Sequence, residues 1–138
     1  MAGRFEILEH TADIGFRAWG GSAAEVFESA AEALMGISTD VAPAHLTERS
    51  VTVDGHDYES LMVNWLGEVL YLFDANEFAA ASFHVVSISP ERLEARLTGE
   101  RRDPARHPWK LIVKAVTYHQ IEVGERNGRW EARVFLDI

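Results

Sequence analysis

Apolar and polar residues alternate along three short segments in the first half of the chain. Residues 4–9 ("RFEILE") and 13–20 ("DIGFRAWG") lie close together, and residues 47–54 ("TERSVTVD") end immediately before Gly55. Alternation with a period of two is typical of strands that have one buried face. The pattern therefore predicts three strands at these positions.

Two longer segments have the spacing of helices. In "SAAEVFESAAEALMGI", Ser22 and Glu25 match a capping box, and the apolar residues that follow recur every three to four positions. In residues 57–76, Asp57 is a candidate N-cap for a helix of about five turns. Because this second helix is apolar on more than one side, we expect it to lie deep against a sheet.

The last third of the chain predicts strands again. The segments are "ASFHVVSI", "RLEARLTGE", "WKLIVKAVTYHQIEV" and "RWEARVFLDI", and "GERNG" at 124–128 predicts a hairpin turn between the last two. Helices and strands do not alternate regularly, which favours an α+β fold. We therefore expect a mostly antiparallel β-sheet with two helices packed on one face, in a single domain over residues 1–138.

Composition limits the class of protein. The chain has 138 residues, of which 47% are hydrophobic, enough for one folded core. No apolar run approaches the roughly 18 residues of a membrane-spanning helix, and the N-terminus lacks the layout of a signal peptide. We expect a cytoplasmic protein with no membrane association.

Charge and cysteine content limit the ligands. The chain contains no Cys, so a bound metal would have oxygen or imidazole ligands, which favours calcium or magnesium. The net charge of −9 opposes binding to a polyanion, so direct RNA binding is expected to be weak or absent. A basic protein partner is compatible with this charge.

Two acidic positions at opposite ends of the chain are candidate metal ligands. Asp13 stands at the head of a predicted strand, where Asp is disfavoured without a partner. Asp137 and the α-carboxylate of Ile138 close the last predicted strand. If these two strands were neighbours, the carboxylates would meet and require a cation between them. The more common alternatives are an Asx turn at Asp13 and a frayed terminus.

Other polar positions carry weaker signals. In a continuous strand, Lys114 and Tyr118 would share one face while His119 would lie on the other. An ordinary strand with a hydrogen-bonded His accounts for these residues equally well. The basic loop at 100–110 is typical of a solvated, proline-stiffened connection, although such a patch can also be a contact site. No dinucleotide-binding, P-loop, zinc-protease or nucleophile-elbow motif is present.

Several of these segments together resemble one family. "EHTADIGFRAWG" near the start, "LMVNWLGEVLYLFD" in the long helix, "KAVTYHQIEV" and the closing "LDI" occur in the order typical of the archease family. The resemblance extends over essentially the whole chain. It implies a small α+β protein that activates an RtcB-type GTP-dependent RNA ligase, which seals tRNA halves during splicing.

The resemblance also implies a mechanism and a site. The protein would promote guanylylation and multiple turnover of the ligase and would not itself be an enzyme. Its divalent metal, described as calcium for the family, with magnesium or manganese as alternatives, would be held by Asp13, Asp137 and main-chain oxygen of Ile138. The residues that could face the partner or adjoin the metal are His10, Lys114, Tyr118 and His119.

Two other function classes remain open at this stage. One is a general chaperone or binding module for nucleic-acid enzymes, which would not depend on Asp13 or on metal. The other is a small metal-dependent hydrolase with His10 or His119 as general base, although no catalytic spacing supports it.

Overall fold

The structure, a computed structural model, describes residues 3–9 and 13–138. In these ranges it contains eight strands and two helices. Their bounds are β1 Arg4–Glu9, β2 Asp13–Gly20, α1 Ala23–Ser38, β3 Thr47–Asp54, α2 Tyr58–Asp74, β4 Ala79–Ser89, β5 Arg92–Glu100, β6 Ala115–Val116, β7 Glu122–Arg126 and β8 Arg129–Asp137. The three N-terminal strands and both helices are confirmed to within two residues of the predicted bounds.

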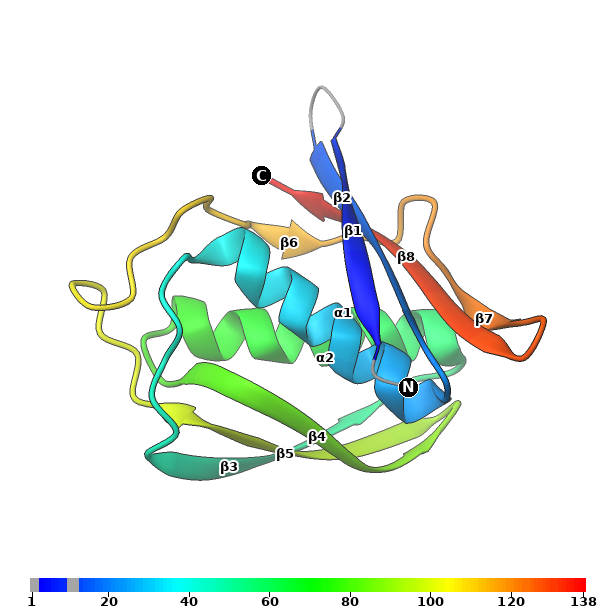
Figure 1. Ribbon diagram of the computed structural model, residues 1–138, viewed down its shortest axis with the longest axis horizontal. Coiled ribbons are helices and arrows are strands. Elements are labelled where there is room, and N and C mark those ends of the chain that lie inside the picture. Colours follow the sequence, from blue (N-terminus) through cyan, green and yellow to red (C-terminus); the bar gives the residue numbers. More distant parts are fainter. Residues whose placement is uncertain (1–2, 10–12) are drawn as a thin grey trace.

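The strands form two antiparallel sheets with both helices between them (Figure 1). One sheet has the order β1-β2-β8, with β6 and β7 each paired to a different part of β8. The other has the order β3-β5-β4. The α+β class, the antiparallel pairing and the packing of two helices against a sheet are confirmed. The division of the strands between two sheets was not predicted.

Each helix begins at a side-chain cap. Ser22 Oγ accepts a hydrogen bond from the Glu25 N–H, and Asp57 accepts one from the Ser60 N–H while the Asp57 N–H donates to Ser60 Oγ. These bonds satisfy N–H groups that have no partner inside a helix. Hydrogen bonding from Ser60 also holds the pKa of Asp57 below its ordinary value. The caps predicted at Ser22 and Asp57 are confirmed.

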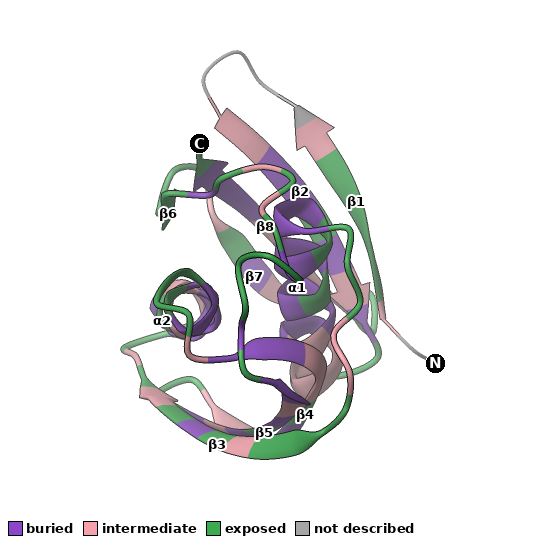
Figure 2. Cartoon of the chain, turned by 90° about the vertical axis from the view of Figure 1, so that its left-hand side faces the viewer, coloured by how far each residue is buried: buried purple, intermediate pink, exposed green. Residues whose placement is uncertain are grey.

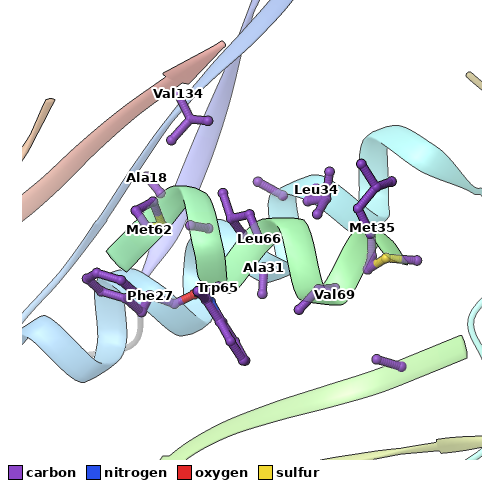
Figure 3. Close-up of a cluster of buried hydrophobic side chains, with 14 of the residues drawn as sticks. Ala18, Phe27, Ala31, Leu34, Met35, Met62, Trp65, Leu66, Val69 and Val134 are labelled. Carbon is purple, nitrogen blue, oxygen red and sulfur yellow. The ribbon is translucent and has the colours of Figure 1, made fainter. Parts of the chain in front are cut away.

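The hydrophobic core lies where the helices face each other and the two sheets. Trp65 of α2 is fully buried, and its indole N–H donates to the carbonyl of Phe27 in α1 at 2.9 Å. Figure 3 shows Ala18 and Val134 above these helices, on strands β2 and β8 of the larger sheet. The side chains on the inner faces of β2 and β8 therefore pack in the core, and only those on the outer faces can contact a ligand or a partner.

The predicted strand at 109–123 is wrong as a continuous element. Only Ala115–Val116 and Glu122–Arg126 are strands. Between them, Thr117 binds the Phe135 carbonyl through both its N–H and its hydroxyl, and Gln120 has a φ of 50°, so the chain leaves the extended conformation. The alternation of side chains expected over 114–119 therefore does not exist.

The hairpin predicted at 124–128 is confirmed. It joins β7 to β8, and its tip residues Asn127 and Gly128 have φ values of 55° and 75°. Two residues with positive φ are typical of the tight turns whose twist matches that of paired strands. This turn sets the register of β8, which carries Asp137 at its far end.

Candidate metal-binding site

The two ends of the chain meet in the larger sheet. In the antiparallel pair of β2 and β8, Asp13 lies directly opposite Asp137, and Ile14 lies opposite Leu136. Directly opposed residues in such a pair project from the same face, with Cβ atoms about 4.5–5.5 Å apart. Figure 1 shows the C-terminus beside the upper end of β2. The strand adjacency on which the predicted cation site depends is therefore present.

The surroundings of the two carboxylates differ. Asp13 is half-buried, and its Oδ1 is buried with no hydrogen-bond partner among the described residues, whereas Asp137 is exposed. Like charges directly opposite each other destabilise a sheet, and a buried oxygen without a partner adds a desolvation cost. A cation between the carboxylates would offset both effects, and carboxylate and main-chain oxygens are the ligands that calcium and magnesium prefer. The donor set therefore fits the metal that the family resemblance implies.

The main-chain oxygens near this pair are held by β6. The Lys114 N–H donates to the Asp137 carbonyl at 2.8 Å, and Ala115 is the register partner of Asp137 on the side opposite to Asp13. Ile138 follows directly and is exposed. Among the described residues, no three His, Asp or Glu side chains cluster as a metal site, so a site here would need main-chain oxygen in addition to the two carboxylates.

An aromatic ring lies next to the carboxylate pair. Phe135 is two residues from Asp137 on the same face of β8, and it is buried although this face points away from the helices. Its register partner is Gly15, where an added Cβ would lie 2.6 Å from the Phe135 ring. Only glycine leaves room for the ring at this position. A glycine inside a strand often marks such a close approach, so Gly15 in "DIGFR" is the sequence signal for this contact.

The remaining candidate residues lie at different distances from the carboxylates. His119 places its ring edge-on to Phe135, with centroids 5.8 Å apart, and Tyr118 is 58% exposed in the same connection between β6 and β7. Lys114 is exposed and reaches the pair through its main chain. His10 lies outside the described residues. The structure thus places Lys114 and His119 next to the strand end, and leaves Tyr118 in solvent.

The basic loop at 100–110 is not a simple solvated loop, because three of its polar residues are buried. Glu100, Arg102 and His107 are each at most 4% exposed. The Asp103 N–H donates to His107 Nδ1, so the ring carries its proton on Nε2 and donates it to Glu100 at 3.1 Å. Arg102 donates to carbonyls of His107 and Phe73. The expectation of a solvated loop is therefore wrong for these residues, which serve the fold.

Two pKa values are shifted in this loop. Hydrogen bonds from the Ala44 N–H, from His107 and from Arg106 lower the pKa of Glu100 to about 2, against the opposing effect of burial. Burial lowers the pKa of Arg102, while the charges of Asp74 and Asp103 raise it.

A third shift lies outside this loop, on α1. Burial and the charge of Glu28 raise the pKa of Glu32.

Comparison with known proteins identifies the family. The model of the Archease protein family matches residues 5–138. The chain belongs to the archease family. The archease of Methanosarcina mazei is 42% identical over 140 residues, covering 98% of this chain and 96% of that protein, and the archease of Pyrococcus abyssi is 40% identical over 140 residues, covering 98% and 99%. The predicted resemblance to archeases is confirmed.

Solved structures give the same fold. The solution structure of protein 1598 from Methanobacterium thermoautotrophicum is 33% identical with a TM-score of 0.78, covering 97% of this chain and 98% of that one. A crystal structure from Thermotoga maritima, described as an archease and possible chaperone, is 18% identical with a TM-score of 0.68, covering 95% and 94%. The archease fold is thus shared with both. In the described ranges of this archease-family chain, no helix has the length and apolar character to span a membrane.

Proposed function

We propose that this chain is a metal-binding accessory protein that activates an RtcB-type GTP-dependent RNA ligase in the cytoplasm. It would promote guanylylation of the ligase and its multiple turnover in tRNA splicing. Membership in the archease family supports an accessory role. The observation that carries the proposal is the pairing of Asp13 with Asp137, with Asp13 Oδ1 buried and lacking a hydrogen-bond partner among the described residues.

In this proposal the chain contributes ligands and their placement, and the ligase contributes the catalytic residues. Asp13 and Asp137 supply carboxylate oxygens, and Ile138 supplies main-chain oxygen. The bond from the Lys114 N–H to the Asp137 carbonyl fixes the end of β8. A bound divalent cation, calcium in the first instance and otherwise magnesium or manganese, supplies positive charge that offsets phosphate charge on a nucleotide.

The surroundings of the site also suit a protein partner better than RNA. The exposed residues at this end of the molecule include Asp137, Ile138 and Tyr118. The whole chain has a net charge of −9. Contact between this end and a basic surface is favoured by charge, whereas phosphate groups would be repelled without the cation. The chain would therefore act by docking beside the active site of the ligase.

The experiment is a guanylylation assay with purified ligase, GTP and calcium, magnesium or manganese, with and without this protein. The variants Asp13→Asn and Asp137→Asn should fold normally, and each should stimulate ligase guanylylation at least tenfold less than the parent protein. Asp40→Asn is the matched control, because Asp40 is a solvent-exposed carboxylate in an ion pair with Lys110 at 3.0 Å, outside the β2–β8 ladder. Full stimulation by both site variants would exclude the proposed role.

A general chaperone is the second candidate, supported by the description of the Thermotoga maritima structure as a possible chaperone. It makes a different prediction in an aggregation assay. If the protein is a general chaperone, the parent protein, the Asp13→Asn variant and the parent after metal chelation should all protect unrelated client enzymes equally well. A ligase activator would show no such protection.

A further inference from the structure

A groove runs beside the exposed face of α2. It has a volume of about 640 Å³ and lies between α2, the end of β3 and the segment at 114–116. Figure 2 looks along α2 and shows this helix at one side of the molecule, with β6 above it and β3 below. The groove therefore lies beside a helix at the side of the molecule, where a partner can approach it.

The α2 wall of the groove has an unusual residue at its centre. Gly67 lies well inside the helix, and a Cβ added there would meet nothing within 4 Å. Alanine would fit and would favour the helix, since glycine is a poor helix former. No contact inside the described chain accounts for glycine at this position. Small residues on a helix surface allow another chain to approach the backbone closely, which points to an external partner.

One exposed and two half-buried apolar residues lie near this glycine. Tyr71, one turn further along α2, is 56% exposed, and Val63, one turn earlier, also lines the groove. On the opposite wall lies Val116. These residues provide an apolar strip that a bulky apolar side chain could cover.

The charges of the groove are predominantly negative. Asp54, Glu68 and Asp74 line it, with Lys114 as the one basic residue among its lining residues. Asp54 is paired with Arg92 at 3.6 Å, whereas Glu68 and Asp74 form no salt bridge within the described ranges. Charge complementarity therefore selects a partner segment with Lys or Arg.

Residues 114 and 115 connect the groove to the candidate metal site. Lys114 and Ala115 line the groove, and the same two residues bind or pair with Asp137 through the main chain. The carboxylates lie on the face of β8 that points away from the helices, and β6 is the edge of this sheet, so a protein that contacts both places would reach around β6 into the groove.

We propose that the groove between α2 and residues 114–116 binds a basic segment of the RNA ligase that carries Lys or Arg next to a bulky apolar side chain. This inference rests on the proposed function and names the surface through which it acts. The ligase would contact the chain at two adjoining places, the carboxylate pair and this groove. Loss of groove contacts should weaken binding while leaving cation binding intact.

The test measures binding of purified ligase to the immobilised protein by biolayer interferometry, together with thermal unfolding of each variant. Gly67→Trp fills the groove and should raise the Kd at least tenfold. Gly67→Ala should raise the unfolding midpoint by roughly 3–5 °C and yet weaken binding. Glu68→Lys should also weaken binding by reversing a groove charge.

Gly36→Ala is the matched control, because Gly36 is also a helical glycine and its added Cβ would make only an ordinary contact of 3.9 Å with Phe5. It should bind ligase like the parent. If Gly67→Trp does not fold, Tyr71→Ala removes the exposed ring without adding bulk and should weaken binding several-fold.

The outcomes separate the two proposals. Unchanged ligase affinity in folded Gly67→Trp and Tyr71→Ala overturns the groove assignment alone. The parent protein could instead form a dimer in sedimentation equilibrium that Gly67→Trp dissociates while ligase affinity stays unchanged. This result would overturn the ligase assignment and give the groove to a second copy of this chain. A parent protein that does not bind ligase overturns both proposals.

Discussion

Asp13 and Asp137 lie directly opposite each other in the antiparallel pairing of β2 with β8. The two carboxylates come from opposite ends of the chain, and the hydrophobic core fixes their register. Ile14, Phe16 and Ala18 on β2 face inward beside their β8 partners, so a slip of one residue would turn this apolar face to solvent. The core therefore enforces a pairing of two acidic residues that the sheet alone would disfavour.

The first prediction concerns stability without metal. In the presence of a chelator, Asp137→Asn should increase the free energy of unfolding by about 0.5 kcal/mol, because it removes repulsion between directly opposed carboxylates. Urea unfolding measures this change. A lower stability of the variant in chelator would show that the charged pair is not repulsive in the metal-free protein.

The second prediction concerns the contact between Gly15 and Phe135. Gly15→Ala should destabilise the protein by about 1–3 kcal/mol, because its Cβ would overlap the Phe135 ring. In a Phe135→Ala background the same substitution should cost much less. The double-mutant cycle is measured by urea unfolding. Equal costs in both backgrounds would show that the ring is not what requires glycine.

The third prediction concerns the pH dependence of stability. Because the pKa of Glu100 falls from 4.5 to about 2 on folding, its ionised form stabilises the protein above pH 4.5, and this contribution disappears as the pH falls from 4.5 to 2. Glu100→Gln should therefore be less stable than the parent at pH 6, by a margin that shrinks towards pH 2. Urea unfolding midpoints of the parent and of Glu100→Gln, measured between pH 6 and pH 2, test this prediction. A stability difference that stays constant with pH would contradict it.

The fourth prediction concerns Arg102. Its guanidinium donates to two carbonyls and to Asn76 and lies 4.0 Å from the Phe73 ring centroid. Arg102→Ala should cost about 3 kcal/mol or more, since it leaves buried acceptors without donors. Arg102→Lys should recover only part of this, because an ammonium group cannot reproduce the planar fork of donors. Full recovery in urea unfolding would contradict this account.

Local patterns were sufficient to predict most of the elements. The caps at Ser22 and Asp57, the strands near the N-terminus and the Asn127-Gly128 turn depend on neighbouring residues, so their signals are present in short segments. The segment at 109–123 was predicted wrongly because its apolar run resembles a strand. Its path depends on the bonds of Thr117 to Phe135, a contact between distant residues that no local pattern contains.

The candidate site was predicted only in part for the same reason. Asp13 and Asp137 were identifiable by residue type, but their meeting depends on the pairing of β2 with β8. Gly67 was read as one residue of an apolar helix, and only the empty space around its α-carbon distinguishes it. Arg102 looked like a solvated charge because the sequence does not reveal that the loop folds back onto Phe73.

The most direct test of the central claim, that the two chain ends form one cation site, is a calcium titration by isothermal calorimetry. The parent should bind one calcium ion, and Asp13→Asn and Asp137→Asn should each weaken binding at least tenfold. The double variant should lose little more than either single one, because both carboxylates serve the same ion. Unchanged calcium affinity in the two single variants would contradict the claim.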